Sequence, residues 1–252
     1  MVRVIMHGCN GVMGQVITGM AKDMEGLKIV AGIDLKNDKE NGYPVYASLE
    51  ECKEEADVVV DFASPKAADH LMDFCAEKQL GLVLCTTGLS EEQIQKVKET
   101  AKKTAVLRSA NMSLGVNLLL KLVQDAAKVL AGSGFDIEIV EKHHNQKKDA
   151  PSGTALALAD SINESLGNQY HYVYDRSSVH EKRDPKEIGI ASVRGGSIVG
   201  DHDVIFAGKD EVITFNHTAY SKAIFAKGAL EAAKFLAGKE PGLYDMSDVV
   251  QL

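Results

Sequence analysis

The first 110 residues alternate apolar runs with amphipathic stretches, and this alternation constrains the fold more than any other feature of the chain. The run 57–63 (DVVVDFA) is continuous and β-branched, as is typical of a strand buried on both faces. Pro65 opens the helix that follows, and Ser90 and Gln93 have the spacing of a capping box. The predicted strands cover residues 2–6, 28–34, 57–63, 81–87 and 104–110, and the predicted helices 15–22, 65–79 and 90–103. Such alternation predicts an α/β fold with a doubly wound parallel (Rossmann) sheet.

The rest of the chain has fewer helices and more strands. The predicted elements are helices 114–130, 153–166 and 221–236, and strands 136–143, 188–194, 203–207 and 211–217. This pattern indicates a second, α+β domain with a mixed or antiparallel sheet. We therefore expect a dinucleotide-binding domain made of residues 1–112 plus 221–252, and a second domain of residues 113–220, with a boundary near Asn111.

Composition excludes several function classes. The net charge of −8 disfavours nonspecific binding to nucleic acid, because phosphates repel an acidic protein. The four cysteines form no CxxC pair, which indicates free thiols in a reducing compartment. The chain starts directly with a strand, and no apolar run approaches the roughly 20 residues of a membrane helix. We expect a cytoplasmic protein with no membrane contact.

A glycine-rich segment joins the first predicted strand to the first predicted helix. Its glycines have GxxGxxG spacing, which lets a backbone turn tightly and approach a pyrophosphate at a helix N-terminus. Asp34 ends the second predicted strand, where an acid binds the adenosine ribose hydroxyls. Lys36 could contact a 2′-phosphate, so NADH and NADPH are both candidates, although a solvated lysine is an equally good interpretation. The segment predicted to contact the dinucleotide is Gly8-Cys9-Asn10-Gly11-Val12-Met13-Gly14.

The carboxyl ends of the later strands should border the same crevice. They are Ala63-Ser64, Thr86-Thr87-Gly88 and Ser109-Ala110-Asn111-Met112, the last of which is expected near the nicotinamide. Cys85 stands in the same region and could be a nucleophile in an aldehyde-oxidising enzyme. Its apolar surroundings favour a buried, inert thiol instead.

The segment 141–155 (EKHHNQKKDAPSGTA) is the most unusual part of the sequence. Ser152 and Thr154 supply hydroxyls at a helix start, which is a site for a carboxylate or phosphate. Lys147 or Lys148 could supply countercharge, and a histidine could exchange a proton near neutral pH. Each residue alone has a plain structural explanation, such as a helix cap or a solvated loop. A metal site is not expected, because adjacent histidines on a strand point to opposite faces and no third ligand has a convincing spacing.

Six segments together indicate a family: residues 8–14 (GCNGVMG), 61–65 (DFASP), 86–88 (TTG), 111–117 (NMSLGVN), 141–154 (EKHHNQKKDAPSGT) and 242–246 (GLYDM). In these segments the chain resembles the 4-hydroxy-tetrahydrodipicolinate reductases, also called dihydrodipicolinate reductases, of lysine and diaminopimelate biosynthesis. Segment 141–154 is the most specific. The resemblance implies a second domain that binds a cyclic dicarboxylate and joins a homotetramer through its sheet.

The resemblance also implies roles for single residues. His143 would be the catalytic acid/base, Lys147 the proton donor, and His144 a substrate contact. Ser152, Gly153 and Thr154 would bind a substrate carboxylate. Cys85, Thr86, Thr87, Ser109, Ala110, Asn111 and Met112 would line the nicotinamide pocket. With the residues indicated by the pattern itself, which are Gly8, Cys9, Asn10, Gly11, Val12, Met13, Asp34 and Lys36, they make up the predicted cofactor-binding set.

Some features depart from the family pattern or leave alternatives open. Asp34-Leu35-Lys36 stands where some members have an acid followed directly by arginine, and region 168–188 is short. Arg194 could hold a carboxylate or could be a structural arginine at a strand end. The implied reaction is NAD(P)H-dependent reduction at C4 of the ring, with protonation at C3 and domain closure. The alternatives are another two-domain NAD(P) dehydrogenase acting on a small anion and a non-catalytic NAD(H) sensor.

Overall fold

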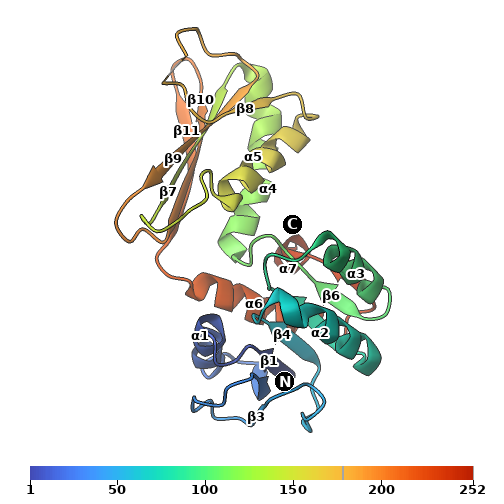
Figure 1. The fold of residues 1–252 in the computed structure, drawn as a ribbon. Helices are drawn as coiled ribbons and strands as arrows, with labels where there is room; N and C mark the ends of the chain where they lie inside the picture. Colours follow the sequence, from blue (N-terminus) through green and yellow to red (C-terminus); the bar gives the residue numbers. More distant parts are fainter. Residues whose placement is uncertain (178, 252) are drawn as a thin grey trace. The chain divides into compact units, whose positions relative to one another are not determined.

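The computed structural model describes residues 1–177 and 179–251 of the 252. The chain forms two compact units, and the first is discontinuous in sequence. Unit 1 contains Met1–Ser113 and Ala223–Gln251, and the part of unit 2 described here is Leu114–Lys222 (Figure 1). Residues 221 and 222, expected in the dinucleotide-binding domain, group with unit 2, and Ser113, expected in the second domain, groups with unit 1. Residue 252 of the expected dinucleotide-binding domain lies outside the described residues.

Unit 1 is built on a seven-stranded sheet in the order β12-β6-β5-β4-β1-β2-β3, with every neighbouring pair parallel. Its strands are β1 (Val2–His7), β2 (Leu27–Ile33), β3 (Val45–Tyr46), β4 (Val58–Asp61), β5 (Gly81–Leu84), β6 (Ala105–Leu107) and β12 (Gly242–Tyr244). Its helices are α1 (Val12–Ala21), α2 (Pro65–Lys78), α3 (Glu91–Ala101), α6 (Ala223–Leu236) and α7 (Met246–Val250). The predicted doubly wound parallel sheet is confirmed.

The core of unit 1 follows from strands that are buried on both faces. All residues of β4 and β5 are buried. Val59 and Leu82 pack against Leu71 of α2 and Val97 of α3, while α6 contacts β4 and β5 and pairs with α1. The predicted capping box of α3 is present, because Ser90 Oγ accepts the Gln93 N–H at 3.2 Å and Gln93 Oε1 accepts the Ser90 N–H at 3.1 Å.

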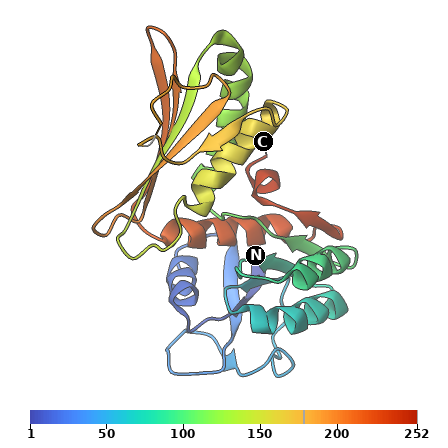
Figure 2. The ribbon, with the colours of Figure 1, turned by 45° about the horizontal axis from the view of Figure 1, so that its top comes forward.

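Unit 2 is a mixed sheet in the order β11-β10-β7-β9-β8. Strand β10 is antiparallel to both of its neighbours, β7 and β11, whereas β8 and β9 run parallel to β7, as the sequence predicted for a mixed sheet. Helices α4 and α5 lie side by side along one face of this sheet (Figures 1 and 2). The elements are α4 (Leu114–Leu130), η1 (Ala131–Ser133), β7 (Asp136–His143), α5 (Gly153–Ser165), β8 (His171–Val173), β9 (Glu187–Arg194), β10 (Gly200–Ala207) and β11 (Val212–Ala219).

Burial alternates strictly along β7 and shows where the core of unit 2 ends. Ile137 and Ile139 join the apolar core under α4 and α5, and Glu141 and His143 continue on the same buried face. The hydrophobic core therefore passes into a buried polar cluster toward the end of β7.

Several predicted boundaries were wrong at the carboxyl edge of the parallel sheet. The strands predicted to reach residues 63, 87 and 110 end at Asp61, Leu84 and Leu107, because the chain leaves the sheet there to form loops. Helix α1 starts at Val12 instead of residue 15. Strands β3, β8 and β12 and helix α7 were not predicted. In the described part of the chain, no helix is long and apolar enough to cross a membrane.

Candidate functional site

The glycine loop after β1 passes too close to other backbone for side chains to fit. Gly8 has φ +81°, and a Cβ there would lie 3.0 Å from the backbone of Ala63. A Cβ on Gly14 would lie 2.2 Å from the Gly8 carbonyl oxygen. Gly11 is the N-cap of α1 and supplies no side-chain cap. The loop thus brings bare backbone to a helix start, which is the geometry that a pyrophosphate needs.

Polar side chains hold this loop in place. Asp34 Oδ2 accepts the Asn10 backbone N–H at 2.9 Å, and Gln15 Nε2 donates to the Cys9 carbonyl at 2.9 Å. Buried Asn41 connects the glycine loop to α1, because its Oδ1 accepts from Gln15 at 2.7 Å and its Nδ2 donates to Asn10 Oδ1 at 2.8 Å. Sequence reasoning missed Gln15 and Asn41, since nothing in the local pattern shows that they meet.

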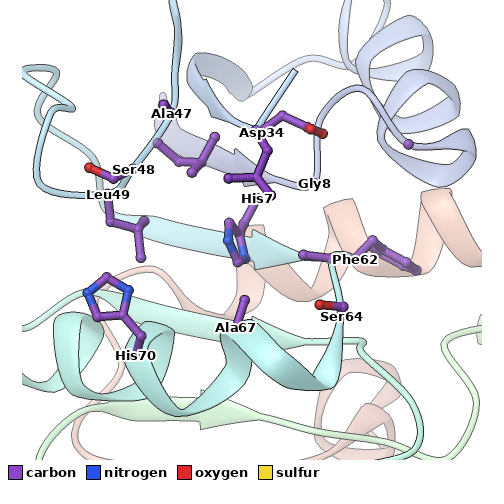
Figure 3. Close-up of a pocket in the computed structure, with 14 residues that line it drawn as sticks. His7, Gly8, Asp34, Ala47, Ser48, Leu49, Phe62, Ser64, Ala67 and His70 are labelled. Atoms are coloured by element: carbon purple, nitrogen blue, oxygen red, sulfur yellow. The ribbon is translucent and has the colours of Figure 1, made fainter. Parts of the chain in front are cut away.

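A pocket of about 420 Å³ opens beside the loop (Figure 3). Among the predicted cofactor residues, Gly8, Gly11 and Asp34 line it. Its other walls include Leu49, Phe62 and Ala67, with Ser48 and Ser64 as polar members. An apolar slot with one carboxylate, next to a glycine loop, fits the adenosine half of a dinucleotide.

The remaining predicted residues of the loop differ in exposure. The Cys9 side chain is fully buried, and a Cβ on Gly32 would lie 2.6 Å from its sulfur, so Cys9 can offer a ligand its backbone alone. Val12 and Lys36 are exposed, and Met13 is partly buried. The Lys36 carbonyl accepts a hydrogen bond from the Asn10 side chain.

The carboxyl ends of β5 and β6 hold the other predicted cofactor residues. Thr87 and Ala110 are exposed, Ser109 and Asn111 partly buried, and the Met112 side chain buried. The Thr86 hydroxyl is buried and has no hydrogen-bond partner among the described residues. Burial raises the pKa of the Cys85 thiol well above its usual range, so the thiol stays protonated and is a poor nucleophile. All four cysteines are free, as expected.

His7 and Asp61 form a buried pair in unit 1 that sequence reasoning also missed. They end the adjacent strands β1 and β4 in direct register, and His7 Nδ1 lies 2.7 Å from Asp61 Oδ1. The His7 ring points into the pocket between Leu49 and Phe62 (Figure 3). The one available signal was that each residue is a polar side chain at the end of an apolar strand.

In unit 2, the predicted catalytic His143 belongs to a hydrogen-bonded cluster around Glu141. His143 Nδ1 lies 2.5 Å from Glu141 Oε2, and Arg194 donates to both Glu141 oxygens at 2.7 and 2.8 Å. Arg194 also donates to the Asp149 carbonyl at 2.6 Å. The guanidinium therefore pairs with an internal carboxylate, which is the structural alternative considered for Arg194.

The start of α5 joins the same cluster. Ser152 is the N-cap, and its Oγ accepts the Ala155 N–H at 3.2 Å and lies 3.2 Å from His202 Nε2. Ser152 also donates its own N–H to Glu141 Oε1 at 3.1 Å. Gly153 is exposed and Thr154 partly buried in the first turn. The structure thus brings His143 and the predicted carboxylate-binding residues together.

His202, on β10, is a further member that the sequence did not reveal. It is 4% exposed, and its ring centroid lies 5.1 Å from that of His143. Burial, assisted by His143, lowers its pKa to about 4, so His202 is neutral near pH 7. Strand register across β7 and β10 was needed to find it.

Lys147 and His144 lie on the turn between β7 and α5. The Lys147 N–H donates to the His144 carbonyl at 3.1 Å, and Lys147 Nζ lies 2.9 Å from Asp149 Oδ1. Lys147 and His144 are partly buried, whereas Lys148 is exposed. Within residues 1–177 and 179–251, no group of three or more His, Cys, Asp or Glu side chains is arranged to hold a metal ion.

Comparison with known proteins identifies the family. Two sequence families match in tandem: "Dihydrodipicolinate reductase, N-terminus" over residues 2–112 and "Dihydrodipicolinate reductase, C-terminus" over residues 115–250. Proteins named 4-hydroxy-tetrahydrodipicolinate reductase from Caldanaerobacter subterraneus subsp. tengcongensis and Clostridium tetani are 56% and 50% identical to this chain. The alignments cover 100% and 98% of this chain, and 99% and 96% of those proteins.

Solved structures agree with the sequence relatives. A dipicolinate-bound dihydrodipicolinate reductase from Paenisporosarcina sp. TG-14 superposes with a TM-score of 0.82 at 26% identity, covering 97% of each chain. A probable dehydrogenase from Thermotoga maritima shares the fold, with a TM-score of 0.63 at 12% identity, over 99% of this chain and 93% of that one. The chain belongs to the dihydrodipicolinate reductase family.

Proposed function

We propose that this chain catalyses the NAD(P)H-dependent reduction of 4-hydroxy-tetrahydrodipicolinate to tetrahydrodipicolinate, a step of lysine and diaminopimelate biosynthesis. One observation carries the proposal beyond family membership. Within segment 141–154, the most specific motif of the sequence, Glu141 connects His143 to the start of α5 in one hydrogen-bonded cluster. An enzyme that reduces an anionic ring needs a proton-exchanging group beside an anion site, and this cluster provides both.

The residues of unit 2 have distinct roles in this proposal. The first turn of α5 holds a substrate carboxylate through the backbone N–H of Gly153 and the Thr154 hydroxyl, with Ser152 fixing the helix start. Lys147 gives a proton to the ring, and His143 exchanges protons through its side chain while His144 contacts the substrate. Arg194 stays with Glu141.

The charge balance of the reaction explains why two cationic groups are needed. Once water has left the substrate, the ring is a conjugated imine that gains hydrogen at C4 and a proton at C3. A nicotinamide cofactor, when bound, supplies the hydride for C4. Lys147 and a protonated His143 offset the negative charge that this addition brings to an already anionic molecule.

We propose that unit 1 binds both NADH and NADPH and prefers NADH. The supporting observation is the pocket beside the glycine loop, which contains Asp34 and, among the residues that the structure describes, no lysine or arginine. A carboxylate accepts hydrogen bonds from ribose hydroxyls and repels a 2′-phosphate. Lys36, exposed two residues beyond Asp34, is the cation available to an NADPH phosphate.

We further propose a cytoplasmic homotetramer assembled through unit 2. Its sheet carries exposed apolar side chains on β9 and β11, namely Val193, Val212 and Ile213. Exposed apolar side chains of this kind are suited to association with a second copy. The four free thiols support a reducing compartment. Light scattering tests the assembly. We expect a tetramer for the wild type and a smaller species for Val212→Glu.

The activity test follows NAD(P)H absorbance with freshly generated substrate, running the two cofactors side by side. Substrate-dependent oxidation of the cofactor supports the reductase, and binding of NADH without turnover supports a sensor. The variant Cys85→Ser tests the remaining alternative, a dehydrogenase that uses the Cys85 thiol as its nucleophile. Activity should persist in this variant, because a partly buried thiol that stays protonated takes no part in the reaction.

A further inference from the structure

We propose that Glu141 is a positioning residue that fixes which ring nitrogen of His143 exchanges the catalytic proton, and that Arg194 holds Glu141 for this task. The inference rests on the proposed function for the role of His143, and extends it to two residues outside the substrate contacts. It starts from an unusual feature of β7: a glutamate with no exposed surface, two residues before the predicted acid/base.

Both oxygens of the Glu141 carboxylate accept hydrogen bonds from neighbouring groups. Oε1 accepts from Arg194 at 2.7 Å and from the Ser152 N–H at 3.1 Å. Oε2 accepts from Arg194 at 2.8 Å and lies 2.5 Å from His143 Nδ1. A fully buried carboxylate is tolerated only when it is paired in this way.

Strand register produces this arrangement. Strands β7 and β9 are parallel neighbours, and His143 is aligned with Arg194. Glu141 and His143 are two residues apart and therefore share one face of β7. The arginine on the adjacent strand reaches the same carboxylate that contacts the histidine, so the three side chains are fixed by the sheet itself.

Glu141 is ionised at neutral pH. Burial alone would raise its pKa, but hydrogen bonds from Arg194, Ser192 and His143 outweigh burial and lower the pKa to about 2. An ionised carboxylate has no hydrogen to donate. His143 Nδ1 must therefore be the donor in the 2.5 Å contact, whether the ring is neutral or charged.

The catalytic proton is then left to Nε2. This nitrogen faces Gly200 at the start of β10, where a Cβ would lie 3.2 Å away. The absence of a side chain at Gly200 keeps space beside Nε2. Glu141 also binds the N–H of Ser152, the N-cap of α5, so one carboxylate orients both the histidine and the proposed carboxylate cradle.

Glutamine at this position would break the arrangement without changing its size. Arg194 donates to both Glu141 oxygens, so the amide NH2 would face an Arg194 donor in either orientation, and in one orientation it would also face the His143 Nδ1–H. The histidine ring would then populate both neutral tautomers. A neutral ring protonated on Nε2 has no lone pair there with which to accept a proton.

The first measurement follows the imidazole nitrogen NMR signals of the wild-type full chain as the pH is raised until they stop shifting, which marks the neutral ring. The His143 signals are assigned by their loss in His143→Gln. We expect a protonated Nδ1 and an unprotonated Nε2. A neutral ring protonated on Nε2 would overturn the proposal, and this result does not depend on how any variant folds or on turnover.

The second measurement compares Glu141→Gln with Glu138→Gln. Glu138 is on the same strand and pairs with Arg183 at 2.8 Å, but does not belong to the His143 cluster, so it is a matched control. Loss of an orienting partner typically costs about 10–100-fold in activity. We expect kcat of Glu141→Gln to fall by about this factor with mixed His143 tautomers, and kcat of Glu138→Gln to stay within about twofold of wild type.

The outcomes separate this inference from the proposed function. Wild-type kcat and an unchanged Nδ1-protonated tautomer in a folded Glu141→Gln would contradict the role of Glu141. A wild type that shows no turnover with the dicarboxylate would contradict the proposed function, while the NMR result on His143 would still stand or fall by itself.

Discussion

His7 Nδ1 lies 2.7 Å from Asp61 Oδ1, and the two residues occupy aligned final positions of the parallel strands β1 and β4. Asp61 is 1% exposed, and its Oδ2 has no hydrogen-bond partner among the residues described. The Ala63 N–H also donates to Oδ1, at 3.1 Å. Among the described residues, the buried Asp61 carboxyl thus has one side-chain partner, His7.

Replacing His7 with leucine should be strongly destabilising, because it removes the side-chain partner of the buried Asp61 carboxyl and leaves it with the Ala63 N–H. Removing one member of a buried pair costs about 3–5 kcal/mol. The double variant His7→Leu/Asp61→Asn should recover part of this loss, since no charge then remains. Urea unfolding measures both free energies. A double variant less stable than His7→Leu alone would show that the pair is not coupled in this way.

Gly14→Ala should weaken NADH binding, because the new Cβ would lie 2.2 Å from the Gly8 carbonyl oxygen and the loop would have to move. A loss of about 1.4 kcal/mol or more corresponds to at least a tenfold rise in the Kd measured by fluorescence titration. Gly19→Ala is the control, since this exposed position of α1 has nothing within 4 Å of the added carbon. It should leave the Kd unchanged and stabilise the helix by about 0.5–1 kcal/mol. Equal Kd values for the two variants would refute the close-approach explanation.

The stability of the protein should fall as the pH drops below about 6.5, where an ordinary histidine begins to bind a proton. Burial is the main cause that lowers the folded-state pKa of His202 to about 4, and His143 and His217 lower it further. Glu141 and Asp201 act in the opposite direction and raise this pKa. The unfolded state therefore binds the proton first, and the contribution of His202 is complete above pH 6.5 and lost toward pH 4. The expected loss is up to about 3 kcal/mol.

Urea unfolding at a series of pH values checks this slope. His202→Gln should flatten it, because the variant has no imidazole to titrate. His70→Gln should keep it, because His70 is exposed and paired with Glu50 on the surface. If His202→Gln keeps the wild-type slope, another group is responsible.

Asp34→Ala should shift cofactor preference from NADH toward NADPH. The variant loses a hydrogen-bond acceptor for ribose hydroxyls and a charge that repels a 2′-phosphate. Because Asp34 also accepts the Asn10 N–H, both cofactors should bind more weakly, so the informative quantity is the ratio of the two kcat/KM values. We expect this ratio to change by about tenfold, which corresponds to 1.4 kcal/mol. Lys36→Ala should move it in the opposite direction, and an unchanged ratio in both variants would contradict these roles.

The sequence predicted those parts of the fold that depend on local patterns. The β-branched run before Asp61 is typical of a strand buried on both faces, and the glycines between β1 and α1 are typical of a tight turn from strand to helix. Both patterns indicate a parallel sheet covered by helices. Strands β3, β8 and β12 have two or three residues each, too few to show a period of two. Strands β3 and β8 form because a longer neighbouring strand offers its edge, and β12 forms along the equally short β6, which a local pattern cannot reveal.

The residues of the candidate site likewise fall into those that a local pattern reveals and those that only the fold brings together. His143 and Lys147 stood out because they lie within one short unusual segment. Glu141 belongs to that segment too, but its role depends on Arg194, 53 residues later and brought close by the pairing of β7 with β9. His202 and the pair of His7 with Asp61 likewise require strand register. Contacts between residues that are distant in sequence were therefore what sequence reasoning missed.

The most direct test of the account is a parallel measurement on His143→Ala/Lys147→Ala, comparing steady-state turnover of the dicarboxylate with the Kd for NADH. The two residues lie in unit 2, whereas the glycine loop and Asp34 lie in unit 1. We predict a fall in kcat of at least about 10²-fold, as for loss of a general acid or base, with the NADH Kd within about threefold of wild type. Full turnover in the double variant would contradict the assignment of proton transfer to the segment 141–154.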